Sequence, residues 1–146
     1  QFRRVWSEDL CEILIQPVYT DNTLGPVLHV VCKPNGVTWI ERRENLRDPN
    51  AWTAFQGAGV RYSATLDGGV WRGEVAIPWK SLGTSGGAEK ANRPALLKFN
   101  VTQHRHQTGE SASWAGPVDF GRDDSFTGIL FVRDPVNPNM NPEKTK

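Results

Sequence analysis

Residues 71–83 read Trp71-Arg72-Gly73-Glu74-Val75-Ala76-Ile77-Pro78-Trp79-Lys80-Ser81-Leu82-Gly83. Val75 and Ile77 share one face with Trp71, while charged and small residues occupy the other face, which is the period of a half-buried β-strand. Pro78 has no N–H to donate, so the strand must end there, and residues 79–82 are expected to form a short helical turn before Gly83. The segment predicts a strand and a turn, and it carries no chemistry of its own.

Strand-like segments recur along the rest of the chain, separated by turn residues. The expected strands are residues 11–18, 27–32, 37–42, 60–66, 70–77, 95–103, 111–114 and 127–133. Lys33-Pro34-Asn35-Gly36 and Asp67-Gly68-Gly69 are strong turn signals, each of which predicts a hairpin. Antiparallel strands with one apolar face bury that face by stacking two sheets, and no amphipathic helix of useful length competes with them. We therefore predict an all-β fold, an antiparallel β-sandwich.

Length and charge limit the domain count and the kinds of partner. The 146 residues are sufficient for one domain with a sizeable core, which we place at residues 1–134. From Pro135 onward almost nothing can be buried, so residues 135–146 are interpreted as a flexible tail or linker. The net charge of +1 provides no basic face for nucleic acid, and no apolar run approaches the roughly 20 residues that span a bilayer.

Cys11 and Cys32 are the two cysteines of the chain, and they fall on consecutive expected strands. Alternation places both on the side of Ile13 and Val30, which we expect to face the core. Such a pair can be a disulfide in a secreted protein or two buried thiols, and the sequence leaves both alternatives open.

Few residues suggest catalysis, and no nucleophile elbow, P-loop or H-E-x-x-H motif is present. His104 and His106 could supply two metal ligands, but without a third ligand nearby in the sequence they are better interpreted as a surface pair. Glu8, Asp9 and Glu12 cluster in the sequence, and together with Glu74 on a neighbouring strand they would allow a paired-carboxylate glycosidase. Carboxylates at strand ends more often accept hydrogen bonds or bind calcium, so we expect a protein that is not an enzyme.

Aromatic residues are the remaining signal, with six Trp and six Phe in a small chain. An exposed indole offers a flat apolar plate on which the C–H face of a sugar ring can stack, and nearby polar groups can then bind its hydroxyls. Trp39, Trp71 and Trp79 occupy strand or post-strand positions and are expected in the core. For Trp6, which precedes a strand, core and ligand plate both stay open.

Three motifs give the chain a family likeness. They are Trp6-Ser7-Glu8-Asp9-Leu10-Cys11-Glu12-Ile13-Leu14-Ile15, then residues 74–79 (Glu-Val-Ala-Ile-Pro-Trp), then residues 97–101 (Leu-Lys-Phe-Asn-Val). In this order the chain resembles the family 9 carbohydrate-binding modules and their DOMON-like relatives, whose pattern runs W-x-x-D-x-x-E-I-F-I, V-E-x-A-I-P-W and F-N-V. The resemblance covers roughly residues 6–132 and implies a jelly-roll-like sandwich.

The resemblance also implies a sugar site. In the binding members of the family, the Trp of the first motif is one of two aromatic plates around a terminal sugar, and the Glu contacts the sugar hydroxyls. These residues correspond to Trp6 and Glu12, and Phe120 is the candidate for the second plate. The next strand of the family contributes an Arg and an Asn, which correspond to His29 and Val31 here. Because Val31 cannot hydrogen-bond a sugar, this departure weakens the implied site.

Two other family traits bear on this chain. Family members begin with two or more strands before the first motif, whereas five residues precede Trp6 here. Either these N-terminal strands lie upstream in a longer protein, or the sandwich lacks them and is completed by something else. Structural calcium is the second trait. Loop carboxylates of the right kind are Asp21, Asp48, Asp119, Asp123 and Asp124.

The sequence therefore predicts a non-catalytic carbohydrate-binding domain of a larger secreted protein. The resemblance implies Trp6, Glu12, His29 and Phe120 as its site residues and cello- or xylo-oligosaccharides as its ligands. The expected location is extracellular, at the cell surface or periplasmic. The alternative is a sandwich of the same ancestry that has lost its sugar and acts as a structural or protein-interaction domain. A haem-binding sandwich is a distant third, because Met140 is the single methionine and lies in the expected tail.

Overall fold

The computed structural model describes residues 8–19, 21–48, 50–56, 59–83, 94, 96–116 and 128–131. It is all-β, and every strand pairing is antiparallel. The strands are β1 (Leu10–Val18), β2 (Val27–Cys32), β3 (Thr38–Arg43), β4 (Trp52–Ala54), β5 (Arg61–Asp67), β6 (Val70–Ala76), β7 (Leu96–Arg105), β8 (Glu110–Ser113) and β9 (Gly128–Phe131). One short 3-10 helix, η2 (Trp79–Leu82), follows β6 among the described residues.

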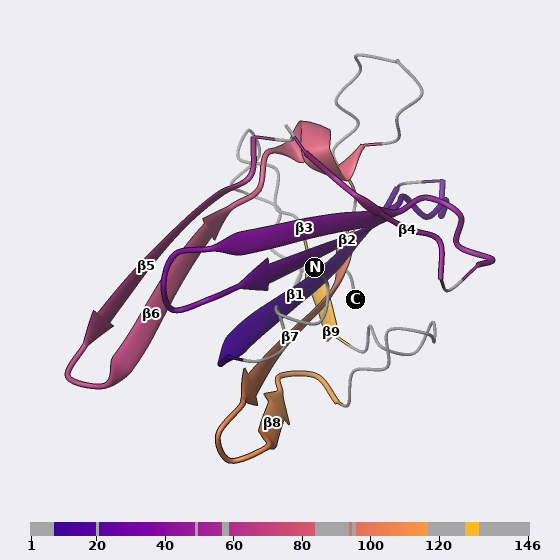
Figure 1. The fold of residues 1–146 in the computed structure, drawn as a ribbon. Helices are drawn as coiled ribbons and strands as arrows, with labels where there is room; N and C mark the ends of the chain where they lie inside the picture. Colours follow the sequence, from indigo (N-terminus) through magenta and orange to yellow (C-terminus); the bar gives the residue numbers. More distant parts are fainter. Residues whose placement is uncertain are drawn as a thin grey trace, which may run out of the picture.

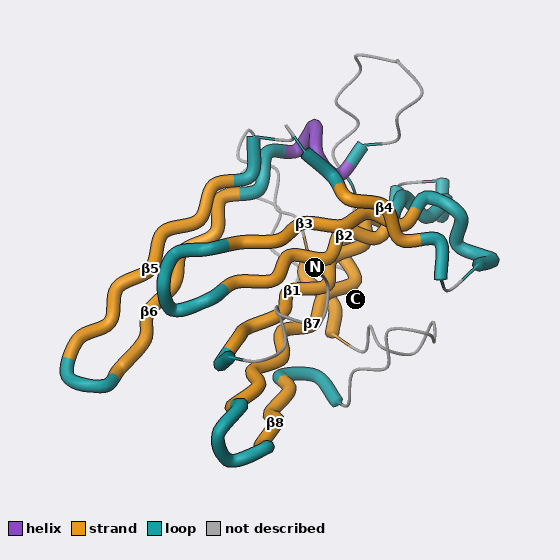
Figure 2. Tube along the Cα trace, viewed as in Figure 1, coloured by secondary structure: helices purple, strands orange, loops and turns teal. Residues whose placement is uncertain are grey.

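The strands form two sheets of unequal size (Figure 1). Seven strands make the large sheet in the order β4-β3-β2-β1-β7-β8, with β9 also paired to β7. The hairpin β5–β6 makes the second sheet, and Figure 2 shows it extending alongside the β2–β3 hairpin. The fold is thus the predicted antiparallel β-sandwich, whereas jelly-roll connectivity stays a prediction.

The core lies between these sheets and contains mainly aliphatic side chains. From the large sheet come Ile15, Leu28, Val30, Cys32 and Leu97, and Leu82 of η2 joins them. Trp71, Val75 and Ile77 pack against this cluster, and the side chains that alternate with them on β6 are exposed. The sidedness predicted for residues 71–77 is therefore confirmed, because the burial follows the period of the strand.

The turns form where the sequence predicted them. Gly68 and Gly69 connect β5 to β6 with φ angles of +55° and +79°, and Asp67 pairs with Val70 across them. A two-residue hairpin turn with two positive φ angles is of the favoured primed type, which glycine adopts without steric strain. This turn sets the register of the hairpin, because its length leaves one way of pairing the two strands.

Several sequence expectations need correction or extension. Trp79 is 41% exposed, because the first position of η2 turns its side chain outward, so its predicted place in the core is wrong. Trp39 is half-buried on the opposite face of the large sheet, and Trp71 alone of the three tryptophans joins the core. Strand β4 lies in a stretch that the sequence left without structure.

The domain limits and the tail were not tested by the described residues. The expected domain 1–134, the tail 135–146 and the missing N-terminal strands depend on residues before Glu8 and after Phe131, which lie outside the described residues.

Candidate functional site

The face of the large sheet that points away from the β5–β6 hairpin carries a row of polar side chains. The registers place Glu12 of β1, His29 of β2, Glu41 of β3 and His104 of β7 on this face, since directly opposite residues share a side of a sheet. Each strand contributes an alternate residue, so the aliphatic core and the polar row occupy opposite sides of the same strands. We call this surface the polar face.

Glu12 is the centre of the row. Its Oε2 lies 2.8 Å from Nε2 of His29, and its Oε1 lies 2.6 Å from Nε2 of His104. The side chain of Glu12 is 1% exposed, so each of its oxygens contacts an imidazole instead of water. A buried carboxylate is stable only when it is paired and hydrogen-bonded. Here His29 hydrogen-bonds Oε2, and His104 lies at ion-pair distance from Oε1.

His29 lies between two carboxylates. Its Nδ1 is 3.5 Å from Oε2 of Glu41, on the side opposite Glu12. Burial alone would lower the pKa of His29, but hydrogen bonds to Glu12 and Glu41 and the charges of both raise it above the ordinary value. Two hydrogen bonds hold the pKa of Glu41 below its ordinary value, although burial raises it. The bond from His29 has the larger effect and the bond from Trp39 the smaller. The arrangement therefore favours an imidazolium between two carboxylates.

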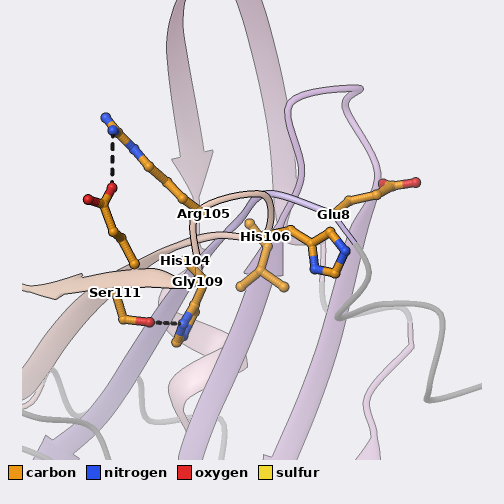
Figure 3. A pocket seen from close by; sticks show the side chains of 8 residues that line it. Glu8, His104, Arg105, His106, Gly109 and Ser111 are labelled. Atoms are coloured by element: carbon orange, nitrogen blue, oxygen red, sulfur yellow. Dashed lines mark hydrogen bonds and ion pairs between the residues drawn. The ribbon is translucent and has the colours of Figure 1, made fainter.

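His104 forms the solvent-facing end of the row. Its Nδ1 lies 2.6 Å from Oγ of Ser111, its direct partner on β8, and a third of its side chain is exposed (Figure 3). A cavity of about 180 Å³ adjoins this end. It is lined by Glu8, Leu10, His104, Arg105, His106, Gly109, Glu110 and Ser111. Pockets for drug-sized ligands measure roughly 300–1,000 Å³, so this hollow is smaller than a site of that kind.

Two half-buried tryptophans flank the opposite end of the row. The indole of Trp52 on β4 packs edge-on against His29, with 5.6 Å between the ring centroids, and the guanidinium of Arg43 lies 5.1 Å from the centroid of the same indole. The indole N–H of Trp39 donates to Oε1 of Glu41 at 2.9 Å. Aromatic surface therefore adjoins charged groups, as in sites that combine stacking with hydrogen bonding.

The structure brings two of the four predicted sugar-binding residues together. Glu12 and His29 are in direct contact, although both are buried and each already has polar partners. Val31 lies opposite Glu12 on the polar face and is 2% exposed. Trp6 and Phe120, the predicted plates, lie outside the described residues.

The sequence did not predict the roles of Glu41 and His104. His104 was expected to form a surface pair with His106, which holds for the exposed His106 and is wrong for His104, because that imidazole reaches the buried Glu12. The missed signal was the pairing order: Glu12 and His104 meet only because β7 lies beside β1. Alternation assigned each residue to a face of its strand but did not identify the neighbouring strand.

Metal binding receives no support from the part of the chain that the structure describes, where no group of three or more His, Cys, Asp or Glu side chains could hold an ion. Among the predicted calcium donors, Asp21 accepts bonds from the backbone and hydroxyl of Thr23, and Asp48 accepts one from the backbone of Asn50. Asp119, Asp123 and Asp124 lie outside the described residues. In the same described part, no helix is long and apolar enough to cross a membrane.

Comparisons with protein-family models, with curated proteins and with solved structures found no match to this chain. The resemblance to family 9 carbohydrate-binding modules therefore stays a prediction from the three sequence motifs.

Proposed function

We propose that this domain is a non-catalytic carbohydrate-binding module that takes a sugar ring in the cavity beside His104 and Ser111. The observation that carries the proposal is the continuous polar row, from Trp52 through His29, Glu12 and His104 to Ser111, that ends in this cavity. Sugar hydroxyls lose water on binding and need fixed donors and acceptors in its place. The hydroxyl of Ser111 is held by His104, which the buried Glu12 holds in turn, so it can meet this need with little loss of side-chain entropy.

In this proposal Glu12 positions the two imidazoles, since both of its oxygens already contact them. Direct hydrogen bonding to the sugar falls to the hydroxyl of Ser111, because both ring nitrogens of His104 already face Glu12 and Ser111. Glu8, which also lines the cavity, is two residues from Trp6 in sequence, so the predicted plate and the cavity are close along the chain. Phe120 is kept as the predicted second plate. The ligand class stays cello- or xylo-oligosaccharides, bound at a terminal ring in an extracellular or periplasmic setting, with structural calcium as an optional addition.

The test is a titration of tryptophan fluorescence with glucose, xylose, cellobiose, xylobiose and galactose, with and without calcium. Ser111→Ala removes one hydrogen-bonding group from the cavity and should weaken binding about 2- to 10-fold, the effect of one net hydrogen bond. Ser63→Ala, an exposed serine on β5, is the matched control and should bind as the unaltered domain does. Trp6→Ala should abolish the signal if Trp6 is a plate.

The second candidate is a structural or protein-interaction domain. The observation in its favour is that Glu12 and His29 are 1% and 4% exposed and contact each other, so the polar row also makes sense as internal structure. A flat fluorescence response to millimolar sugar from folded protein, together with an unchanged heat of mixing in calorimetry, would reject the sugar proposal and support this candidate.

A further inference from the structure

Cys11 and Cys32 are direct partners across the antiparallel pair β1–β2, and both thiols are free. They lie on the core face of the large sheet, where Cys32 belongs to the buried cluster and Cys11 packs against it. The sequence placed both cysteines on this face, and the register now shows that they are opposite each other.

The backbone geometry of this pair suits a covalent link. Directly opposite residues of antiparallel neighbours have their Cα atoms about 4.5–5.5 Å apart. Disulfides span Cα separations of about 4.4–6.8 Å, so the two strands already hold the cysteines within the required range. Both side chains also point to the same face, which is the other condition for bridging.

The two thiols differ in access. Cys11 is half-buried, whereas Cys32 is 2% exposed. A soluble reagent should therefore meet Cys11 first.

We propose that Cys11 and Cys32 form an oxidation site that closes a β1–β2 disulfide by exchange with a small-molecule disulfide such as oxidised glutathione. The thiolate of Cys11 attacks one glutathione sulfur, and the other glutathione leaves as a thiolate that takes up a proton. The thiolate of Cys32 then attacks the Cys11 sulfur of this mixed disulfide and releases the second glutathione. Two cysteine thiols are oxidised, one glutathione disulfide is reduced to two thiols, and the two cysteine protons are transferred to them.

The surroundings indicate a slow, persistent link rather than a rapid switch. Burial is the main reason that the pKa of Cys11 is raised to about 11 and that of Cys32 to about 12. Thiols of high pKa supply little thiolate at neutral pH, and they are poor leaving groups when the disulfide is attacked. The bond would join the two strands that carry Glu12 and His29, so it would hold these strands in register independently of whether the domain binds sugar.

The experiment treats the full chain with oxidised glutathione at about pH 9, where the thiolate fraction rises. Free thiols are then counted in denaturant, and the mass of the intact protein is measured. The expected product has no free thiols, is lighter by two hydrogens and carries no glutathione. Proteolysis should yield a linked Cys11–Cys32 peptide. The oxidised protein should unfold at a higher urea concentration, and a dithiol reductant should restore the original midpoint.

Two variants separate the steps. Cys32→Ser should accumulate a stable glutathione adduct on Cys11, and Cys11→Ser should keep Cys32 unmodified, because Cys32 is buried. If either serine variant is unfolded by circular dichroism, the alanine variant replaces it. A lasting glutathione adduct on the unaltered protein, or two free thiols in folded protein whose unfolded form reacts readily, would overturn the proposal.

Discussion

At the scale of single residues, Glu12 is a buried carboxylate with one imidazole beside each oxygen. Glu12→Gln removes the charge at nearly constant shape and leaves His29 beside a neutral amide. Removing one partner of a buried pair costs about 3–5 kcal/mol, so we expect the free energy of unfolding in urea to fall by about 3 kcal/mol. Glu110→Gln, in the exposed pair with Arg105, is the control and should change it by less than about 0.5 kcal/mol. Equal effects of the two variants would contradict the structural role of Glu12.

His29 predicts how stability depends on pH. Its folded pKa is raised above the ordinary value of 6.5, so the stabilisation is fully present below about pH 6.5 and is lost as the pH rises through the folded pKa. The lowered pKa of Glu41 acts in the other direction, with stabilisation present above its ordinary value of 4.5 and lost as the pH falls. Urea midpoints across this range should therefore peak between about pH 4.5 and 6.5. In His29→Gln the fall of the urea midpoint with rising pH should become shallower. If this fall is unchanged in the variant, a group other than His29 causes it.

At the scale of elements, Tyr62 connects the hairpin sheet to the large sheet. Its hydroxyl donates to the carbonyl of Lys33 at 2.8 Å and accepts the indole N–H of Trp71 at 3.0 Å. Tyr62→Phe keeps the ring and loses both bonds, so unfolding in urea should become easier by about 1–3 kcal/mol. Amide hydrogen exchange in β5 and β6 should also accelerate. Ser63→Ala is the control on the exposed side of the same strand. If it lowered the free energy of unfolding as much as Tyr62→Phe does, the effect would come from any change in β5 and not from the two hydrogen bonds of Tyr62.

Strand β9 depends on the absence of a side chain at its first residue. A Cβ on Gly128 would lie 2.5 Å from the carbonyl oxygen of Phe99 and would also overlap the indole of Trp114. The indole can move, but the carbonyl belongs to β7 and cannot move freely. Gly128→Ala should therefore loosen β9, with faster hydrogen exchange at residues 128–131. Gly83→Ala is the control, because the added Cβ would make an ordinary 3.5 Å contact with the carbonyl oxygen of Lys80. This variant should change the free energy of unfolding by less than about 0.5 kcal/mol.

The same elements show how far the sequence reached. The alternation along β6 predicted the strand and its buried face, and the two glycines before it predicted the hairpin turn. Both predictions succeeded because these features depend on residues that are neighbours in the sequence. The core face of the two cysteines was predicted for the same reason. Strand β4 was missed because three residues are too few to show a period, and it exists only through pairing with β3. His104 was misplaced because its partner, Glu12, is 92 positions away in sequence (104 − 12).

At the scale of the whole molecule, one large sheet uses its two faces for different purposes. The face toward the hairpin holds the aliphatic core, and the opposite face holds buried ion pairs whose groups come from four strands. Buried pairs contribute less to stability than apolar packing of the same volume, but they penalise any register that separates the charges. The polar row therefore helps to specify one alignment of β3, β2, β1 and β7, whether or not a sugar binds at its end.

Net charge distinguishes the proposed ligand from an acidic one. The chain carries 17 basic and 16 acidic residues, so its net charge is close to zero. Binding of an anionic polymer releases counterions and weakens steeply with salt, whereas a neutral sugar held by hydrogen bonds and stacking releases none. We expect the affinity for cellobiose or xylobiose to change less than about twofold between roughly 50 and 500 mM NaCl, measured by fluorescence titration. A loss of tenfold or more over this interval would indicate that the site recognises negative charge, and acidic saccharides would then replace neutral ones as the ligand class to test.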